Sequence, residues 1–264
     1  MNILYEIVEH KRKIVDAAKR RQPLRDLEQS PYFDRKGISL SERLRATSAL
    51  GVIAEFKRRS PSKGDINTGV SPGEVGVAYA EAGAAGISVL TDTKYFGGKA
   101  ADLSEVREGV DIPILRKDFI IDAYQVYEAK AIGADVILLI AECLDKVELG
   151  ELATLAHALD MEVLMEVHSA AQLEKLHSDI DMVGVNNRNL ETFVVDIRTS
   201  LELYDAIPDD FVKISESGLR DATSMQKVKT RGFDGVLVGE QFMKSSRPGA
   251  ACARIIRQLE QLYE

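Results

Sequence analysis

Residues 51–64 read GVIAEFKRRSPSKG, and the character of the chain changes in the middle of this stretch. An apolar run at 52–54 gives way to the acid Glu55, the base Lys57 and the hydroxyl of Ser60, after which proline and glycine break regular structure. A buried strand that delivers charged groups to one end is badly suited to packing, because buried charges need partners. It is well suited to a functional site, and the rest of the chain repeats this layout.

Seven further apolar runs follow, with helical patterns between them, and the runs are near-continuous, as expected for parallel strands covered on both faces. The eight predicted strands span residues 52–56, 86–91, 112–116, 135–141, 161–166, 182–186, 211–215 and 234–238. This alternation predicts an α/β fold, either a (β/α)₈ barrel or a long doubly wound sheet. Because no Gly-x-Gly-x-x-Gly follows the first strand and eight strands suit closure, we predict a (β/α)₈ TIM barrel over residues 51–264.

Several helices carry explicit boundary signals. The predicted N-caps, each followed three residues later by Glu or Gln, are Ser71, Asp122, Asp145 and Ser169. Gly83 and Gly133 stand where helix C-termini should end. These signals support the alternation of strand and helix.

The front of the chain, residues 1–50, is predicted to be a helical extension packed on the barrel, so that residues 1–264 form a single domain. Residues 3–20 show the periodicity of an amphipathic helix, and a short second segment lies near 40–50. The helix is rich in bases, among them Lys11, Arg12 and Lys13. We interpret this basic run as a solvated face in preference to a binding patch.

Composition and charge restrict the classes of partner. The 264-residue chain has 34 Lys and Arg against 42 Asp and Glu, a formal net charge of −8, which argues against nucleic acid or an anionic membrane. Cys143 and Cys252 provide neither a disulfide framework nor a metal-binding spacing, so a reducing cytoplasm is expected. The N-terminus lacks the apolar core of a signal peptide, and the longest apolar run, 136–141, is too short to cross a membrane.

Polar side chains stand at the C-terminal end of every predicted strand, where barrels of this kind build their active sites. These side chains and glycines are Glu55 and Lys57, Thr91 and Asp92, Lys117 and Asp118, Glu142, Glu166, Asn186 and Arg188, Glu216 and Ser217, and Gly239 and Glu240. We expect them to converge on one cup.

The ends of the last two strands predict a phosphate site. Ser217 and Gly218 follow strand seven, and Gly239 follows strand eight, each before a helical pattern. Glycine lets backbone N–H groups approach an anion, and a helix N-terminus adds partial positive charge. The alternative is that Gly218 and Gly239 only serve tight turns.

Lys57, Lys117 and Glu166 are the candidates for acid–base chemistry. Either lysine could donate a proton or bind a substrate carboxylate, the alternatives being ion pairs of Lys57 with Glu55 and of Lys117 with Asp118. Glu166 is a candidate general base, or else the partner of one of the lysines. Nearby His168 is expected to serve as a loop or cap residue, and Cys143 to be an inert thiol.

These strand ends resemble the indole-3-glycerol-phosphate synthase family of tryptophan biosynthesis. The matching segments are 55–64 (EFKRRSPSKG), 90–92 (LTD), 94–98 (KYFGG), 115–119 (LRKDF), 165–167 (MEV), 184–190 (GVNNRNL), 215–218 (SESG) and 238–240 (VGE). They follow in order along essentially the whole chain, and the first is the most specific. The basic N-terminal helix also resembles the extra front segment of that family.

The resemblance implies a lyase that converts the phosphorylated small molecule 1-(2-carboxyphenylamino)-1-deoxyribulose 5-phosphate into indole-3-glycerol phosphate, CO₂ and water, with no cofactor or metal. It implies Lys117 as general acid with Lys57 as its rival, and Glu166 as general base. The other implied catalytic residues are Glu55, Asn186, Glu216 and Ser217. The implied substrate-binding residues are Ser60, Phe96, Arg188, Gly218, Gly239 and Glu240.

Two alternatives stay open. Phosphoribosylanthranilate isomerase is a similar phosphate-binding barrel, but that family uses a cysteine at the end of its first strand, where this chain has Glu55 and Lys57. A sugar-phosphate-binding barrel without catalysis is the other. We expect a monomer or weak homodimer, and Gly64 and Gly69 make residues 60–68 a candidate lid.

Overall fold

Eight parallel strands close into a barrel in the computed structural model, which describes residues 3–190 and 192–262. Strands that are neighbours in the barrel follow one another along the chain, and β10 returns to pair with β1. The strands are β1 (Gly51–Phe56), β4 (Gly86–Leu90), β5 (Ile114–Lys117), β6 (Val136–Ile140), β7 (Glu162–Val167), β8 (Met182–Asn186), β9 (Val212–Glu216) and β10 (Gly235–Val238). Each strand end lies within two residues of its predicted position. The predicted TIM barrel is therefore confirmed, and the doubly wound alternative is wrong.

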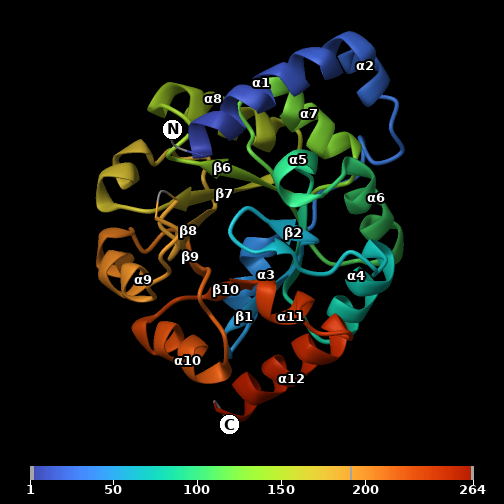
Figure 1. Cartoon of the computed structure of the whole chain (residues 1–264). Coiled ribbons are helices and arrows are strands. Elements are labelled where there is room, and N and C mark those ends of the chain that lie inside the picture. The colour runs from blue at the N-terminus through green and yellow to red at the C-terminus, as the bar shows by residue number, and fades with distance from the viewer. Residues whose placement is uncertain (1–2, 191, 263–264) are drawn as a thin grey trace.

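Helices and helical turns follow the strands and form an outer ring around the barrel (Figure 1). They are α4 (Pro72–Glu81), α5 (Thr93–Phe96), α6 (Ala100–Gly109), α7 (Ala123–Ala131), α8 (Lys146–Ala158), η1 (Ala170–Lys175), α9 (Arg198–Leu203), η2 (Tyr204–Ala206), α10 (Ala222–Arg231), α11 (Glu240–Met243) and α12 (Pro248–Gln261). A short antiparallel pair that the sequence analysis missed, β2 (Arg59–Ser60) with β3 (Gly64–Asp65), lies between β1 and α4. Within the described residues, no helix is both long and apolar enough to cross a membrane.

Most of the predicted helix boundaries are confirmed at the level of individual atoms. The side chains of Ser71 and Asp122 accept hydrogen bonds from backbone N–H groups in the first turns of α4 and α7. Asp145 forms a reciprocal capping box at the start of α8. Gly83 and Gly133 each follow the C-cap residue of a helix, α4 and α7, and have φ values of +88° and +94°, which glycine adopts without steric cost.

The predicted cap at Ser169 is wrong. Its side chain makes no capping hydrogen bond, and the segment that it precedes is the 3₁₀ helix η1. The side chain of Gln172 instead binds the backbone just before this segment, because its Oε1 atom accepts a hydrogen bond from the backbone N–H of His168 at 2.6 Å. The same amide donates to the carboxylate of Glu142.

The N-terminal end of the barrel is closed by α3 (Leu40–Ala46), whose Leu40 and Leu44 are fully buried among the inward-facing strand residues. A Cβ atom on Gly51 would lie 2.4 Å from Leu44 Cδ2, and one on Gly86 would lie 2.8 Å from Leu40 Cδ1. The helix can pack this closely because the facing strand positions are glycine. The opposite end, where the strands finish, is the one that holds the main cavity.

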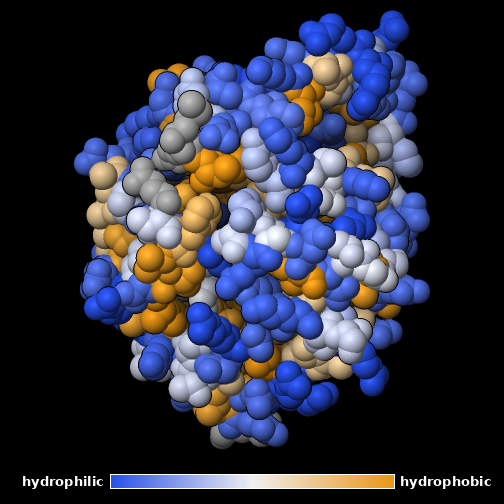
Figure 2. Space-filling view, viewed as in Figure 1, coloured by the Kyte–Doolittle hydropathy of each residue, from blue (hydrophilic) through white to orange (hydrophobic). Residues whose placement is uncertain are grey.

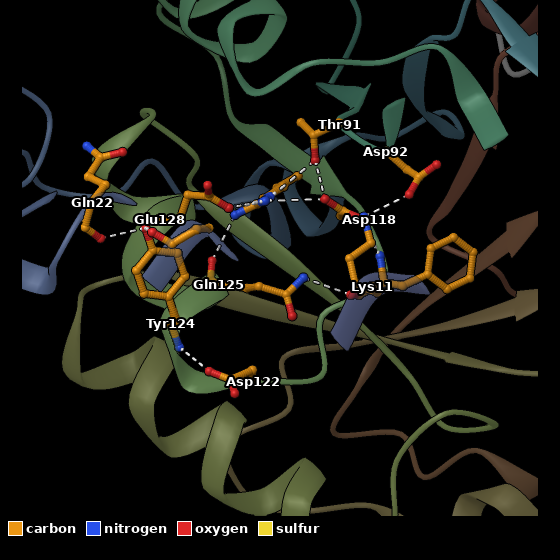
Figure 3. Close-up of polar contacts among 12 residues, drawn as sticks. Lys11, Gln22, Thr91, Asp92, Asp118, Asp122, Tyr124, Gln125 and Glu128 are labelled. Atoms are coloured by element: carbon orange, nitrogen blue, oxygen red, sulfur yellow. Dashed lines mark hydrogen bonds and ion pairs between the residues drawn. The ribbon is translucent and has the colours of Figure 1, made fainter. Parts of the chain in front are cut away.

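The long helix α1 (Ile3–Arg21) lies along the rim of that opposite end, beside α7, and is followed by α2 (Leu24–Leu27) (Figure 1). The predicted solvated basic face is wrong for Lys11, which is only 4% exposed. Its Nζ atom lies 2.7 Å from Asp92 Oδ2 and 2.7 Å from Asp118 Oδ1 (Figure 3). A buried ammonium is tolerated here because two carboxylates from the ends of β4 and β5 compensate it.

Candidate active site

A cavity of about 610 Å³ opens at the C-terminal ends of the strands. Its mouth lies near the middle of the face in Figure 2, with hydrophilic and hydrophobic side chains around it. All of the residues predicted to form the site line it: Glu55, Lys57, Ser60, Phe96, Lys117, Glu166, Asn186, Arg188, Glu216, Ser217, Gly218, Gly239 and Glu240. The strand ends therefore converge much as expected.

Three of the polar residues expected in the cup do not line it. Asp92 points to Lys11, and Thr91 donates its hydroxyl to Asp118 at 2.7 Å, because α1 covers the end of β4 (Figure 3). Glu142 binds the Gln172 amide instead. The prediction that polar side chains from all eight strand ends line the cavity was too broad. A polar residue that follows a strand can instead bind a neighbouring element outside the cavity.

Lys117 lies between two buried carboxylates at the floor of the cavity. Its Nζ atom is 3.1 Å from Glu166 Oε2 and 3.0 Å from Glu216 Oε2. The alternative pair of Lys117 with Asp118 is wrong, because consecutive residues at a strand end point to opposite faces. Asp118 instead pairs with Lys11 and with Arg116 Nη2, which lies 3.2 Å away.

The three groups of this cluster shift one another's pKa. Burial acts to lower the pKa of Lys117, but the carboxylates of Glu216, Glu166 and Glu55 outweigh it and raise that pKa. Burial raises the pKa of Glu216 to about 7, whereas for Glu166 burial is outweighed by Lys117 and by His168, so that its pKa is lowered. Two carboxylates that share one ammonium thus have pKa values moved in opposite directions, so that Glu166 loses its proton more readily and Glu216 titrates near neutrality.

Close packing of glycine positions Glu216 and Glu55. A Cβ atom on Gly184 would lie 2.2 Å from Glu216 Oε1, and one on Gly239 would lie 2.4 Å from Glu55 Oε1. Glu55 in turn accepts from Lys57 Nζ at 2.5 Å, so the ion pair considered for Lys57 is present. Glycine at position 239 therefore leaves room for the Glu55 carboxylate, a packing role that the sequence analysis did not predict.

The turn after β9 has an unusual backbone. Ser217 and Gly218 both lie in the left-handed region, with φ values of +67° and +78°. This conformation is costly for serine, and such strain is held mainly at functional sites. Within the described part of the chain, the backbone N–H groups of Gly218, Leu219 and Gly239 donate no backbone hydrogen bond. These amides border the cavity and can receive an anion.

Arg188 lines the cavity between the β2–β3 turn and α11. Its guanidinium lies 3.4 Å from Ser62 Oγ in the β2–β3 turn and 3.8 Å from Glu240 Oε2 in α11. Asn186 connects Arg188 to the cluster of Lys117, Glu166 and Glu216, because its Nδ2 atom donates to Glu166 Oε1 at 3.1 Å and its Oδ1 atom accepts the Arg188 backbone N–H.

The cavity has an apolar wall that sequence reasoning missed. Phe96 was predicted, and its ring lies 6.1 Å from that of Phe119, centroid to centroid. Ile3, Leu4 and Ile7 of α1 add to the same lining. The only signal in the sequence was the apolar stripe of the first helix, which gives no information about which cavity it faces. Together with the cationic side chains of Lys57 and Arg188, this wall suits a substrate that has an aromatic ring and negative charges.

A family model for indole-3-glycerol phosphate synthase matches residues 4–255. The chain belongs to this family. A relative from Bacteroides thetaiotaomicron, named indole-3-glycerol phosphate synthase, is 45% identical over 259 residues, covering 98% of this chain and 99% of the relative. One from Delftia acidovorans with the same name is 39% identical over 263 residues, covering 96% and 98%.

Solved structures that resemble this indole-3-glycerol phosphate synthase family member include more distant barrels. One is 3-hexulose-6-phosphate synthase from Salmonella typhimurium, with a TM-score of 0.63, 13% identity and coverage of 81% of this chain and 100% of that one. Another is thiamine phosphate pyrophosphorylase from Pyrococcus furiosus, with a TM-score of 0.60, 14% identity and coverage of 85% and 99%. At such identities the likeness shows the barrel fold alone.

Proposed function

We propose that this protein is an indole-3-glycerol phosphate synthase that closes the indole ring of 1-(2-carboxyphenylamino)-1-deoxyribulose 5-phosphate with loss of CO₂ and water. The observation that carries the proposal is Lys117 held between Glu166 and Glu216 in the cavity of a chain from this family. We further propose that it acts in the cytoplasm as a monomer or weak homodimer.

In the first step, the ring carbon that bears the carboxylate attacks the ribulose carbonyl carbon, and the electron pair of the C=O bond moves to oxygen. Lys117 is the proposed acid for that oxygen. Its raised pKa keeps it in the ammonium form, and an alkoxide is basic enough to take the proton. Lys57 is the rival acid, but its ammonium is held by Glu55.

Decarboxylation then breaks the bond between the ring carbon and the carboxylate, and the electron pair restores the ring. In this proposal Lys57, with help from Arg188, binds the carboxylate until it leaves as CO₂. Both cations line the cavity, and the apolar wall of Phe96 and α1 would pack against the aromatic ring.

Dehydration requires a base that removes a proton from the former ribulose C1, so that the C–H electron pair forms the new C=C bond, and an acid that protonates the hydroxyl so that it leaves as water. Lys117, protonated again from solvent, is the proposed acid for that hydroxyl. Glu166 is the proposed base, because its pKa is lowered and it stays ionised, and Asn186 orients it. Ser217 and Glu216 are proposed to hold the sugar hydroxyls. The amides of Gly218 and Gly239, with Ser60, Glu240 and the start of α11 nearby, are proposed to surround the phosphate.

The test is turnover of the carboxyphenylamino-deoxyribulose phosphate, followed by indole fluorescence, in the wild type, Lys117→Ala and Glu166→Gln. We expect wild-type turnover and losses in kcat of roughly 10²- to 10⁴-fold for each variant, the range for a lost general acid or base.

Each other outcome has a distinct meaning. If the wild type binds the compound without forming an indole product, the chain is a sugar-phosphate-binding barrel. Turnover of phosphoribosylanthranilate in its place would support the isomerase alternative. If Lys117→Ala alone keeps most of its rate, Lys57 becomes the acid.

A further inference from the structure

The imidazole of His168 makes no hydrogen bond within the described part of the loop where it lies. The sequence predicted a loop or cap residue, yet both ring nitrogens are buried without a hydrogen-bond partner among the described residues. The side chain is 14% exposed, and its Nε2 atom lies 3.6 Å from Glu166 Oε1. Buried polar atoms without partners are uncommon and call for a specific explanation.

The loop is held by other groups. The backbone N–H of His168, not its ring, is bound by Gln172, and Gln172 is bound in turn by Glu142. The imidazole is therefore free to serve the carboxylate beside it. The distance of 3.6 Å exceeds a normal hydrogen bond by roughly half an ångström, a gap that a small side-chain movement can close.

The surroundings of Glu166 explain why such a movement would occur during turnover. In the structure, Lys117 compensates the charge on Oε2, and Asn186 donates to Oε1. If Lys117 gives its proton to the substrate, Glu166 loses its cation while still buried, at a stage before it has acted as a base. Asn186 already donates to Glu166, so the imidazole of His168, 3.6 Å from Oε1, is a further N–H group that can move to donate to this carboxylate.

We propose that His168 is a positioning residue for Glu166, donating a hydrogen bond from Nε2 to Oε1 when Lys117 turns toward the substrate. This inference rests on the proposed function, in which Glu166 is the base of the dehydration step. His168 does not line the cavity, so it acts through Glu166 and not on the substrate.

Other charged groups also lie around this pair. Lys117 of β5 and Glu216 of β9 face Glu166 from the barrel interior. Glu142 and Lys175 approach from the β6–α8 turn and η1, on the side of Cys143. A pH profile reports on the whole cluster, so the test compares variants that differ at His168 alone.

The experiment measures kcat, KM and the pH profile of kcat for His168→Leu and His168→Gln. Leucine removes both nitrogens, whereas the glutamine amide keeps an N–H donor. We expect His168→Leu to lose about tenfold or more in kcat, the effect of losing a hydrogen bond to a charged group, with KM within about twofold. Because the donor favours the ionised form of Glu166, its loss should move the acidic limb to higher pH.

His168→Gln should keep kcat within about threefold of the wild type and leave the acidic limb in place. The control His177→Leu removes a partly exposed imidazole that lies 3.7 Å from Asp179, and it should leave kcat unchanged. If His168→Leu and His168→Gln lower kcat equally, the imidazole ring only fills space, and the proposal is overturned. Wild-type kcat in His168→Leu would also overturn it.

A second readout is independent of turnover. Titration of ¹³C-labelled glutamate carboxyls by NMR, with the Glu166 signal assigned from Glu166→Gln, should show a higher pKa for Glu166 in His168→Leu than in the wild type or His168→Gln. If the pKa of Glu166 in His168→Leu equals that in the wild type, His168 donates no hydrogen bond to Glu166, and the proposal is refuted. If the wild type forms no indole product, the proposed function fails, while this titration still decides whether His168 acts on Glu166.

Discussion

Replacing Lys11 by methionine should weaken the attachment of the N-terminal helix to the barrel. The ammonium of Lys11 lies 2.7 Å from both Asp92 and Asp118, and all three side chains are buried. Methionine keeps much of the side-chain volume but leaves two buried carboxylates without their shared cation. Breaking a buried ion pair in this way typically costs about 3–5 kcal/mol.

The hydrogen bonds and ion pair that Asp118 and Asp92 keep in Lys11→Met place the expected loss of stability near the lower end of that range. Asp118 keeps Arg116 and the hydroxyl of Thr91, and Asp92 keeps the backbone N–H of Tyr95. We therefore expect a loss of about 3 kcal/mol in the free energy of unfolding near neutral pH. Because Ile3, Leu4 and Ile7 line the cavity, KM for the substrate should rise as well.

The loss should depend on pH in a defined direction. Burial acts to raise the pKa of Asp118, but Lys11 and Arg116 outweigh it and lower that pKa to about 2. This value lies below the unfolded value of about 3.9, so the contribution to stability is complete above about pH 4 and is lost as the pH falls toward 2. The stabilities of the wild type and Lys11→Met should therefore converge in that window.

The assay is urea unfolding followed by far-UV circular dichroism, since the chain has no Trp. Lys13→Met, which removes an exposed lysine from the same helix, is the matched control and should change the free energy of unfolding by less than about 0.5 kcal/mol. Equal stabilities for Lys11→Met and Lys13→Met at pH 7 would refute the reasoning. A difference between them that persists unchanged at pH 3 would refute the assignment to Asp118.

Three further predictions concern the site and one helix. Gly239→Ala places a Cβ atom 2.4 Å from Glu55 Oε1 and should lower kcat/KM, whereas Gly69→Ala, with no atom within 4 Å, should not; steady-state kinetics on both variants checks this. Glu216→Gln should remove an ionisation near pH 7 from the pH profile of kcat/KM, because the pKa of Glu216 is raised to about 7; an unchanged profile would contradict this. Asp145→Ala deletes the capping box of α8 and should lower the free energy of unfolding by about 1 kcal/mol in urea titrations, without affecting kcat.

Local patterns were sufficient to predict the strands and most caps. Asp145 and its partner are three residues apart, so their pairing depends on the geometry of one helical turn and can be read from the chain. The location of the polar strand ends could also be predicted from the sequence, because closing a parallel barrel brings the C-terminal end of every strand to one rim. This is why all of the predicted site residues line a single cavity.

Pairings between distant segments could not be predicted in the same way. Lys11 and Asp92 are 81 residues apart, and Lys117 and Glu216 are 99 residues apart. The sequence analysis offered ion pairs only as alternatives to functional roles, and of these Lys57 with Glu55 and Glu166 with Lys117 are present, whereas Lys117 with Asp118 is wrong. Adjacent strand residues face opposite ways, so the true partners come from other strands.

By itself the sequence determined the barrel, the end of the barrel that carries the chemistry and the residue types found there, because each depends on local periodicity and on the rule that parallel strands end together. The tertiary structure decided the charge states. The pKa of Lys117 is raised, that of Glu166 is lowered and that of Glu216 is raised to about 7 because of which groups share a buried space, and His168 lies beside Glu166 for the same reason. Burial and the distance between charges set these properties, and both arise only when the strands meet.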